Sequence, residues 1–408
     1  MDKKKGSVFG AILLIVGSCI GVGMLGLPIM TGLCGFFPSL VAFVLGFAFM
    51  IATSLLMLEV NGWFSHKVNM VSMASRTLGK YGKIAGWIFF LFFFYTLLVA
   101  YIAGIGSLVS SFFQDYFLMH IPDWVGSLGM VVLLGWIVYL GTRSVDLTNR
   151  YLVMGKIAAF ICLIFIGAAH VNPNFLLRSN FSYVLFSLPM FVLAFGFQNM
   201  IPVLSSYMEG DHKRVRFSVL VGGIVTLSIY LIWQVITLGI IPLAGPSGIE
   251  ESLKEGKEAA QAISGILGSH WVSYFASGLA FFAILTAFLA QSLGLSHFLE
   301  DGFKVSYKKH ENIGICSLVV IPPLIFAVIY PTIFLKALNF AGGICLMFLY
   351  GILPVLMVWK GRYHLKLHGP YKVAGGKPLL VIVFLFALFV AFFQLSTMFD
   401  APYIPKVG

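Results

Sequence analysis

Residues 8–37 form an apolar run that is long enough to cross a lipid bilayer, but its centre is unsuited to a continuous helix. Within this run, residues 17–28 read GSCIGVGMLGLP and hold four glycines and a proline. Glycine disfavours a helix interior by roughly 1 kcal/mol and proline by about 3 kcal/mol. Unwound backbone is tolerated at membrane depth only where it lines protein or a water-filled cavity. The run therefore indicates a discontinuous helix that forms a substrate site; a kinked span with glycines for close packing is the simpler alternative.

The composition is that of a polytopic helical membrane protein. Hydrophobic residues make up 60% of the chain and charged residues 10%, whereas soluble domains are about 25% charged. Several apolar windows of spanning length follow one another. A net charge of +11 would suggest nucleic acid as the partner of a soluble protein, but here the basic residues lie in short loops between apolar runs. We therefore expect a lipid bilayer, and no nucleic acid, as the partner.

The apolar runs predict eleven spans in a single membrane transport domain over residues 1–408. Their approximate limits are 8–34, 38–60, 84–112, 124–142, 151–170, 183–208, 217–242, 271–299, 313–331, 333–359 and 378–397. With the N-terminus placed inside, most lysines and arginines fall in inside segments. The outside segments hold only Arg178, Lys254, Lys257, Lys336 and Lys406. Because basic loops stay in the cytoplasm, we expect the N-terminus inside and the C-terminus outside.

Two connecting segments carry helical patterns of their own. Residues 66–83 place Val68, Met70 and Met73 beside basic residues, which predicts a short interfacial helix on the cytoplasmic side. Residues 249–268 combine four glutamates with apolar residues at helical spacing, which predicts one amphipathic outer helix. That helix either caps an outward vestibule or lies in solvent without a gating role.

A second span repeats the pattern of the first. Residues 191–202 read FVLAFGFQNMIP, so that Gly196, Gln198 and Asn199 precede Pro202. The two broken spans are five apart, and an odd offset gives the second unit the opposite orientation in the membrane. We expect an inverted repeat with a first unit at 1–170, a second at 183–359 and an additional span at 378–397. Helix N-termini at the breaks would attract a carboxylate, and freed carbonyls an ammonium, which favours an amino acid as substrate.

At these residues the chain resembles the hydroxy and aromatic amino acid permeases, in the tyrosine/tryptophan branch of the amino acid-polyamine-organocation superfamily. The matching motifs are IGVGMLGLP at 20–28, LEVN at 58–61, FGF at 195–197 with IP at 201–202, SLGL at 292–295 with LEDG at 299–302, NFAG at 339–342, GILP at 351–354 and WKGR at 359–362. The resemblance implies a leucine-transporter-type fold of eleven spans and proton-driven uptake of tyrosine or tryptophan across a bacterial inner membrane. One departure is that the family usually carries His-Gly where this chain has Gln198-Asn199.

The candidate substrate site surrounds the two breaks. We expect the main-chain N–H groups of Gly21, Val22 and Gly23 to hold the carboxylate, and carbonyls near Ser18, Phe195 and Gly196 to hold the ammonium. The remaining candidates are side chains that would meet the substrate's own side chain: Phe195 and Phe197 around an aromatic ring, Gln198 and Asn199 at a phenol hydroxyl, and, by analogy with the resembling fold, Tyr95 and Thr286. Ordinary core packing explains any single phenylalanine equally well, because the chain has 40 of them.

Lys156 is the ionisable group that best suits coupling to protons. It lies inside the cytoplasmic half of the fifth span, and ionisable groups within a membrane are functional by default. In the resembling fold, some proton-coupled transporters place a lysine of this span where sodium-coupled ones bind a cation against the first span. We expect Lys156 to charge and discharge during the cycle; a lysine that snorkels to the interface is the alternative.

Glu59 follows the second span, and we expect it either to pair with a basic loop residue and steady a cytoplasmic gate or to be an ordinary interfacial charge. Histidines and cysteines show no ligand spacing, so that no metal site and no cofactor are expected. A sodium-coupled or exchange carrier for other neutral amino acids is the alternative function. An integral membrane enzyme would need a nucleophile or acid–base pair that the spans lack, and a channel would need a repeated polar lining. One chain suffices for the expected site, so a monomer is enough.

Overall fold

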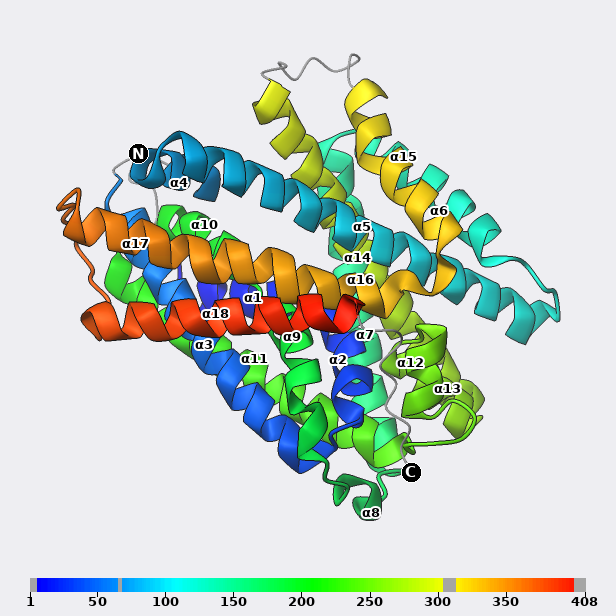
Figure 1. Cartoon of the computed structure of the whole chain (residues 1–408). Coiled ribbons are helices and arrows are strands. Elements are labelled where there is room, and N and C mark those ends of the chain that lie inside the picture. The colour runs from blue at the N-terminus through cyan, green and yellow to red at the C-terminus, as the bar shows by residue number, and fades with distance from the viewer. Residues whose placement is uncertain (1–5, 65–67, 304–312, 400–408) are drawn as a thin grey trace.

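The computed structural model describes residues 6–64, 68–303 and 313–399, and its regular elements in these ranges are all helical (Figure 1). Within the described chain, eight helical segments are long and apolar enough to cross a membrane, and a bent pair of helices makes up to nine. Two further apolar helices have 17 residues each. Each predicted span coincides with one of these segments. The chain is therefore a polytopic integral membrane protein. The basic residues at 3–5, 67, 304, 308, 309 and 406 lie outside the described ranges.

The α-helices are α1 (Val8–Cys19), α2 (Val22–Gly32), α3 (Phe36–Gly62), α4 (Met70–Leu78), α5 (Lys80–Phe117), α6 (Asp123–Tyr139), α7 (Thr142–Ala168), α8 (Pro173–Leu176), α9 (Val184–Ala194), α10 (Ile201–Tyr207), α11 (His212–Ile240), α12 (Ile249–Glu255), α13 (Ala259–Leu267), α14 (His270–Phe303), α15 (Ile313–Ile329), α16 (Phe334–Phe340), α17 (Leu353–Tyr363) and α18 (Gly376–Phe399). Three short 3₁₀ turns and one π-helix complete the fold: η1 (Phe181–Tyr183), η2 (Gln198–Met200), η3 (Pro331–Ile333) and the π-helix η4 (Ala341–Ile352).

The first span breaks where its glycines predict. Helix α1 ends at Cys19, Gly21 is extended, and α2 leaves at 54° to α1. Pro28 lies inside α2 and has no N–H to give to the carbonyl of Met24, four residues earlier. The indole N–H of Trp233, on α11, donates to that carbonyl at 3.0 Å instead. A side chain from another span thus makes the proline tolerable.

The sixth span is also interrupted at the predicted place. Helix α9 ends at Ala194, residues 195–197 are not helical, and η2 leads into α10. The N–H groups of Phe195, Gly196 and Phe197 donate to the carbonyls of Phe191, Leu193 and Phe195 in irregular turns. These turns replace the regular helical pattern at the interruption.

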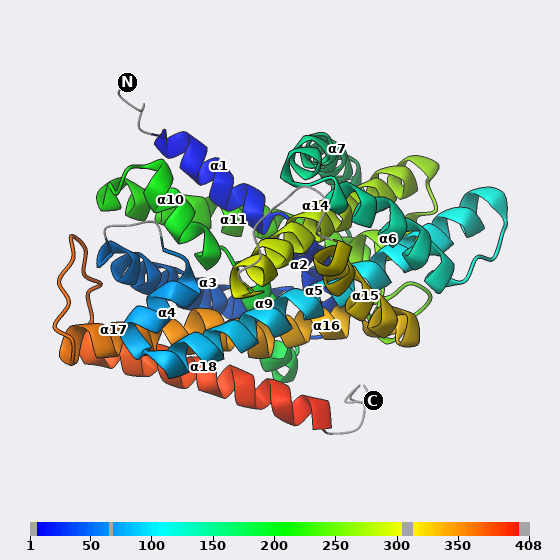
Figure 2. The ribbon, with the colours of Figure 1, turned by 90° about the horizontal axis from the view of Figure 1, so that it is seen from above.

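The remaining helices enclose these two breaks. Helix α1 packs along α11, and α2 and α3 both pack on α9. Helix α14 lies against α7 and α5, while α15 and α6 run side by side on the outside of the bundle (Figure 1). On another face, α17 and α18 are neighbours in both views (Figure 2). The breaks consequently lie in the interior, where unwound backbone can be matched by side chains.

The π-helix η4 is a feature that the sequence pattern did not indicate. It comes very close to α9: a Cβ placed on Gly342 would lie 2.0 Å from the carbonyl oxygen of Pro189. Gly343 similarly adjoins Gln394 of α18, whose amide oxygen accepts from Asn339 at 3.1 Å. Glycines allow these three spans to approach at backbone distance.

The two helical connecting segments turn out differently. A short helix, α4, forms within residues 66–83 as predicted and buries Met70, Met73, Ala74 and Thr77; residues 65–67 lie outside the described chain. Residues 249–268 form two helices, so the prediction of a single helix was wrong. Gly256 adopts a left-handed conformation (φ 73°) that ends α12, and Glu258 caps the start of α13.

Glu258 should make stability depend on pH near neutrality. Its carboxylate accepts N–H groups of Ala260 and Gln261, but burial outweighs these bonds and raises its pKa from 4.5 to about 7. The folded chain then binds more protons than the unfolded chain between these values. Stability should be greatest below pH 4.5 as far as this group is concerned, and should fall as the pH rises through about 7.

Thermal unfolding of the detergent-purified protein between pH 5 and 8 checks this expectation. Glu258→Gln should flatten the fall in melting temperature across this range. The matched control is Glu255→Gln, because the carboxylate of Glu255 is exposed on α12. An unchanged pH profile in Glu258→Gln would contradict the assignment.

Candidate functional site

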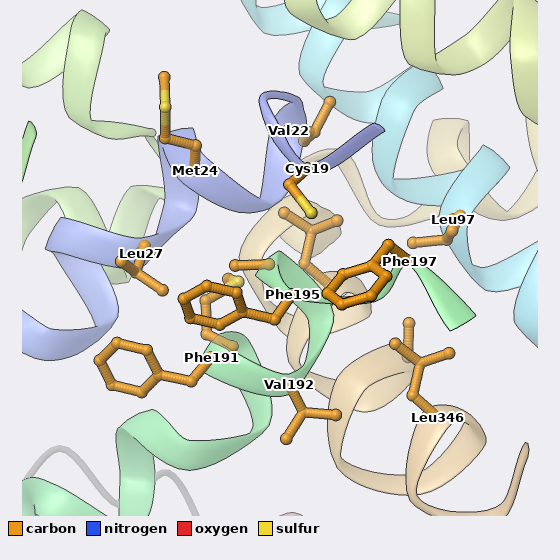
Figure 3. Close-up of a cluster of buried hydrophobic side chains, with 14 of the residues drawn as sticks. Cys19, Val22, Met24, Leu27, Leu97, Phe191, Val192, Phe195, Phe197 and Leu346 are labelled. Carbon is orange, nitrogen blue, oxygen red and sulfur yellow. The ribbon is translucent and has the colours of Figure 1, made fainter. Parts of the chain in front are cut away.

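The two broken spans touch at their interruptions. A Cβ placed on Gly23, in the first turn of α2, would lie 3.0 Å from the Cα of Ala194, the last residue of α9. Figure 3 shows Cys19 and Val22 of the first break in one buried cluster with Phe195 and Phe197 of the second. The contact between the breaks that the sequence predicts is thus present. The inverted repeat from which it was inferred stays a prediction.

Tyr230, on α11, joins the two breaks through its hydroxyl group. The oxygen lies 2.6 Å from the carbonyl oxygen of Cys19, at the end of α1, and 2.6 Å from that of Ala194, at the end of α9. The side chain is 0% exposed. A hydroxyl has one proton to donate, so it satisfies one carbonyl fully and leaves the other in need of a donor. Sequence reasoning missed this residue, because nothing local distinguishes it from other tyrosines in the spans.

Lys156 reaches the first break from α7. Its Nζ donates to the carbonyl oxygen of Ile20 at 2.6 Å, and the residue is 5% exposed. The predicted burial of Lys156 within its span is confirmed, which disfavours the snorkelling alternative. Among the residues that the structure describes, no carboxylate lies within ion-pair distance of the ammonium. The recorded partner of a charge at this position is the main-chain dipole of Ile20.

The start of α2 offers main-chain donors. Gly21 precedes the helix without a side-chain cap, and Gly21 and Gly23 are only half buried, whereas Val22 is buried. N–H groups in a first helical turn have no partner within the helix and form a ready site for an anion. The hydroxyl of Ser18 donates its proton to the carbonyl of Ile15 in its own helix at 2.7 Å, so toward a ligand its oxygen can only accept.

The two phenylalanines of the second break face protein. Phe195 and Phe197 are both fully buried. The ring of Phe195 meets Tyr230 edge-on at a centroid distance of 5.0 Å and Phe47 at 5.8 Å. Gly196 between them is half buried against Leu346 of η4. In this structure both rings help to position the break rather than border open space.

A cavity of about 640 Å³ adjoins the second break. Gln198 and Asn199 form part of its wall, and Phe90, Phe94 and Phe298 line it from α5 and α14. The other lining residues come from α3, the segment before α4, α4, α10 and α14: Met57, Val68, Asn69, Met70, Val71, Pro202, Val203, Ser206, Gly294 and His297. The cavity therefore lies toward the end of the bundle that carries the basic loops.

Two predicted contacts are not at this cavity. The hydroxyl of Tyr95 donates to the carbonyl of Leu318 on α15 at 2.8 Å. The hydroxyl of Thr286 donates to Ala283 within its own helix at 2.9 Å. Both belong to the predicted helices, α5 and α14, of which Phe90, Phe94 and Phe298 line the cavity; contact of Tyr95 or Thr286 with a substrate stays a prediction. When a helix is apolar on all sides, the hydropathy of its sequence does not indicate which face borders a cavity.

Glu59 holds the end of the bundle beside the cavity. Its carboxylate pairs with the guanidinium of Arg362, at the end of α17, with a bond of 2.6 Å from Nε and a second from Nη2. It also accepts the N–H of Val373 at 2.7 Å, and Arg362 donates to the carbonyl of that residue at 2.9 Å. The predicted pairing with a basic residue is present, although Arg362 lies in the last turn of α17 rather than in a loop; a role in a cytoplasmic gate stays a prediction. The pair is almost fully buried, so Glu59 is more than an ordinary interfacial charge.

Breaking this pair should strongly destabilise the protein. Glu59→Ala would leave the Arg362 guanidinium buried and uncompensated, at a cost of about 3–5 kcal/mol. Replacing both residues, as in Glu59→Leu with Arg362→Met, should recover most of that loss because no charge is left buried. Chemical unfolding in detergent measures both variants. A single variant as stable as the wild type would show that the pair is solvated.

Comparisons with known proteins agree with this architecture. The tryptophan/tyrosine permease family matches residues 4–394. The tyrosine-specific transport system 1 of Haemophilus influenzae is 33% identical over 98% of each chain, and its tyrosine-specific transport system 2 is 30% identical over 95% of each. The tryptophan-specific transport protein of Shigella flexneri is 27% identical over 97% of this chain and 96% of its own. The chain belongs to the tryptophan/tyrosine permease family and is thus a transporter rather than an enzyme.

Proposed function

We propose that this protein imports aromatic amino acids, tyrosine first and tryptophan next, by proton-coupled alternating access across the bacterial inner membrane. Similarity to transporters named for these two amino acids supports the substrate class, and the higher identity to the tyrosine-specific ones supports the order. The observation that carries the mechanism is the contact between the Lys156 ammonium and the Ile20 carbonyl at the break of the first span.

The substrate's backbone would bind at the two breaks. The uncapped N–H groups at Gly21 to Gly23 suit its carboxylate. The carbonyls of Cys19 and Ala194 share the single proton of Tyr230, so one of them can accept from the substrate's ammonium. An amino acid carries both charges on neighbouring atoms, which matches donors and acceptors that lie on touching helix ends. Main-chain carbonyls near Ser18, Phe195 and Gly196 complete this proposed site.

Lys156 would couple transport to protons. When charged, its ammonium binds the Ile20 carbonyl and holds α1 against α7. When neutral, it loses the charge-assisted part of that bond, and the break is freer to rearrange. Sodium coupling is the less favoured alternative, because the lysine already occupies the carbonyl to which a cation would bind. Intramembrane ionisable groups that face the bundle interior commonly serve as proton relays.

The position of the cavity supports an inward-facing state. It adjoins the basic end of the bundle, which the positive-inside rule assigns to the cytoplasm. At the other end, Ile249 of α12 packs on Gly32 of α2. The structure thus fits an inward-facing state of an eleven-span carrier with the N-terminus inside and the C-terminus outside. All groups of the proposed site come from one chain, so a monomer suffices.

Uptake into proteoliposomes tests the proposal. Radiolabelled tyrosine should accumulate when the outside is more acidic than the inside, in the absence of sodium. Unlabelled tryptophan should compete strongly, and leucine and serine should not. Uptake that requires sodium would overturn the coupling, and accumulation of leucine in preference to aromatic amino acids would overturn the substrate class.

Neutralising Lys156 should separate accumulation from exchange. In Lys156→Gln, proton-driven accumulation should fall to simple equilibration, while exchange of internal for external tyrosine continues. Lys156→Arg should also fail to accumulate, because a guanidinium keeps its proton throughout the cycle. The matched control is Lys254→Gln, an exposed lysine on α12. Undiminished accumulation in Lys156→Gln would contradict the role.

Removing the Tyr230 hydroxyl should destabilise the protein. Tyr230→Phe leaves two converging carbonyls without a donor, and an unsatisfied buried group costs about 1–3 kcal/mol. The free energy of unfolding, measured by chemical unfolding in detergent, should fall by about that amount. Tyr101→Phe, at another buried tyrosine, is the control. Equal stability of the wild type and Tyr230→Phe would refute the bridging role.

A further inference from the structure

We propose that the side-chain carbonyl of Gln198 is a fixed hydrogen-bond acceptor that selects substrates with an N–H or O–H donor on the aromatic ring. Tyrosine has a phenol O–H and tryptophan an indole N–H, whereas the ring of phenylalanine has no donor. Gln198 thereby determines that the transporter takes tyrosine and tryptophan and discriminates against phenylalanine. This inference rests on the proposed function and adds the basis of its selectivity.

The orientation of the Gln198 amide follows from its neighbours on α3. Its Nε2 donates to the main-chain carbonyl of Met50 at 3.2 Å and to the hydroxyl oxygen of Thr53 at 2.9 Å. The Met50 carbonyl can only accept. The hydroxyl of Thr53 gives its one proton to the same Met50 carbonyl at 3.1 Å, so toward Gln198 it too can only accept. The NH₂ group must therefore face α3, and the carbonyl oxygen must face away.

That oxygen has no hydrogen-bond partner among the described residues. Gln198 is 0% exposed, and its Oε1 is buried and unpaired. Buried polar atoms are paired in the large majority of cases, and an unpaired one is costly. A fixed amide with both donor directions used and its acceptor free can be satisfied by a donor on a ligand. It cannot form a hydrogen bond with a ligand that has no donor.

The cavity supplies the surroundings that an aromatic ring requires. Gln198 lies in its wall, and the rings of Phe90, Phe94 and Phe298 lie within 5.8–6.3 Å of one another, centroid to centroid. Aromatic rings pair favourably at such distances, and the volume of about 640 Å³ is within the usual range of ligand pockets. Three apolar rings hold an aromatic side chain of any kind, so the discrimination falls to the polar wall.

Asn69 and Asn199 are the other amides of this wall, and their positions do not give them the same selectivity. Both are exposed, and the Oδ1 of Asn69 already accepts the N–H of Ser72. The groups of Asn199 can bond to water and can turn to either donate or accept. The amide of Gln198 is held in one orientation by two partners. Only a fixed, desolvated acceptor penalises a ring without a donor.

A first experiment uses the wild-type transporter and ring-substituted phenylalanines as competitors of radiolabelled tyrosine uptake. The 4-amino compound carries a donor, whereas the 4-fluoro and 4-methoxy compounds and phenylalanine carry none. We expect tryptophan and 4-aminophenylalanine to compete well. The compounds without a donor should compete roughly 5- to 150-fold more weakly, the range expected for one buried hydrogen bond. Equal competition by 4-fluorophenylalanine would overturn the proposal without the need for any variant.

A second experiment changes the protein. Gln198→Met keeps the length of the side chain and removes the acceptor, so the ratio of KM for phenylalanine to KM for tyrosine should fall toward one. Uptake of phenylalanine shows that the variant is folded. Thr77→Val is the matched control, because the buried hydroxyl of Thr77 bonds to Met73 within α4 and does not touch Gln198, and its ratio should stay as in wild type. A wild-type ratio that persists in Gln198→Met would overturn the role of Gln198.

The failures of the two proposals can be told apart. If the wild type accumulates no aromatic amino acid at all, the proposed function fails, and the selectivity inferred from it falls as well. If the wild type accumulates tyrosine and phenylalanine equally well, the function stands and the role of Gln198 is refuted.

Discussion

Lipid offers no hydrogen-bond partner to unwound backbone, and the arrangement at the centre of this protein follows from that constraint. Two spans are interrupted, and each interruption frees carbonyl groups. Side chains from two other spans supply the missing donors: Tyr230 for Cys19 and Ala194, Trp233 for Met24, and Lys156 for Ile20. Helix α11 contributes the first two of these side chains, so it acts as the surface on which the first span is held in its broken form. The break in the first span therefore depends on α7 and α11 as well as on the span itself.

These bonds to the breaks are few. Lys156 and Trp233 each donate one hydrogen bond to a main-chain oxygen, and Tyr230 has one proton for two such oxygens. In the proposed cycle, the substrate's ammonium supplies one of these oxygens with a donor, and loss of the proton from Lys156 weakens the bond to another. Elsewhere the contacts are of a different kind. Glu59 and Arg362 join α3 to α17 through several charge-assisted bonds in a nearly dry setting, and such a pair is costly to open. The structure thus combines single hydrogen bonds at the two breaks with a multiply bonded ion pair between α3 and α17.

The sequence predicted what depends on local composition. Four glycines and a proline within residues 17–28 locate the first break, Gly196 to Pro202 locate the second, and the depth of Lys156 follows from the length of its span. It did not predict what depends on how one helix is rotated against another. Tyr230 is one of 16 tyrosines, and only the three-dimensional structure places its hydroxyl between two helix ends. For the same reason the pattern did not indicate that Phe94 and Phe298 line the cavity from the helices that carry Tyr95 and Thr286.

The partner of Lys156 bears on how a membrane protein can use a buried charge. A carboxylate beside the ammonium would form an ion pair, and in a medium of low polarity such a pair holds its proton firmly. A main-chain carbonyl is a dipole, which stabilises the ammonium enough for it to be buried but binds it less strongly. In the proposed coupling, changes in water access around α1 and α7 shift the balance between the charged and the neutral amine. A carbonyl freed by a broken helix is accordingly a better partner for a group that must gain and lose a proton than an acid would be.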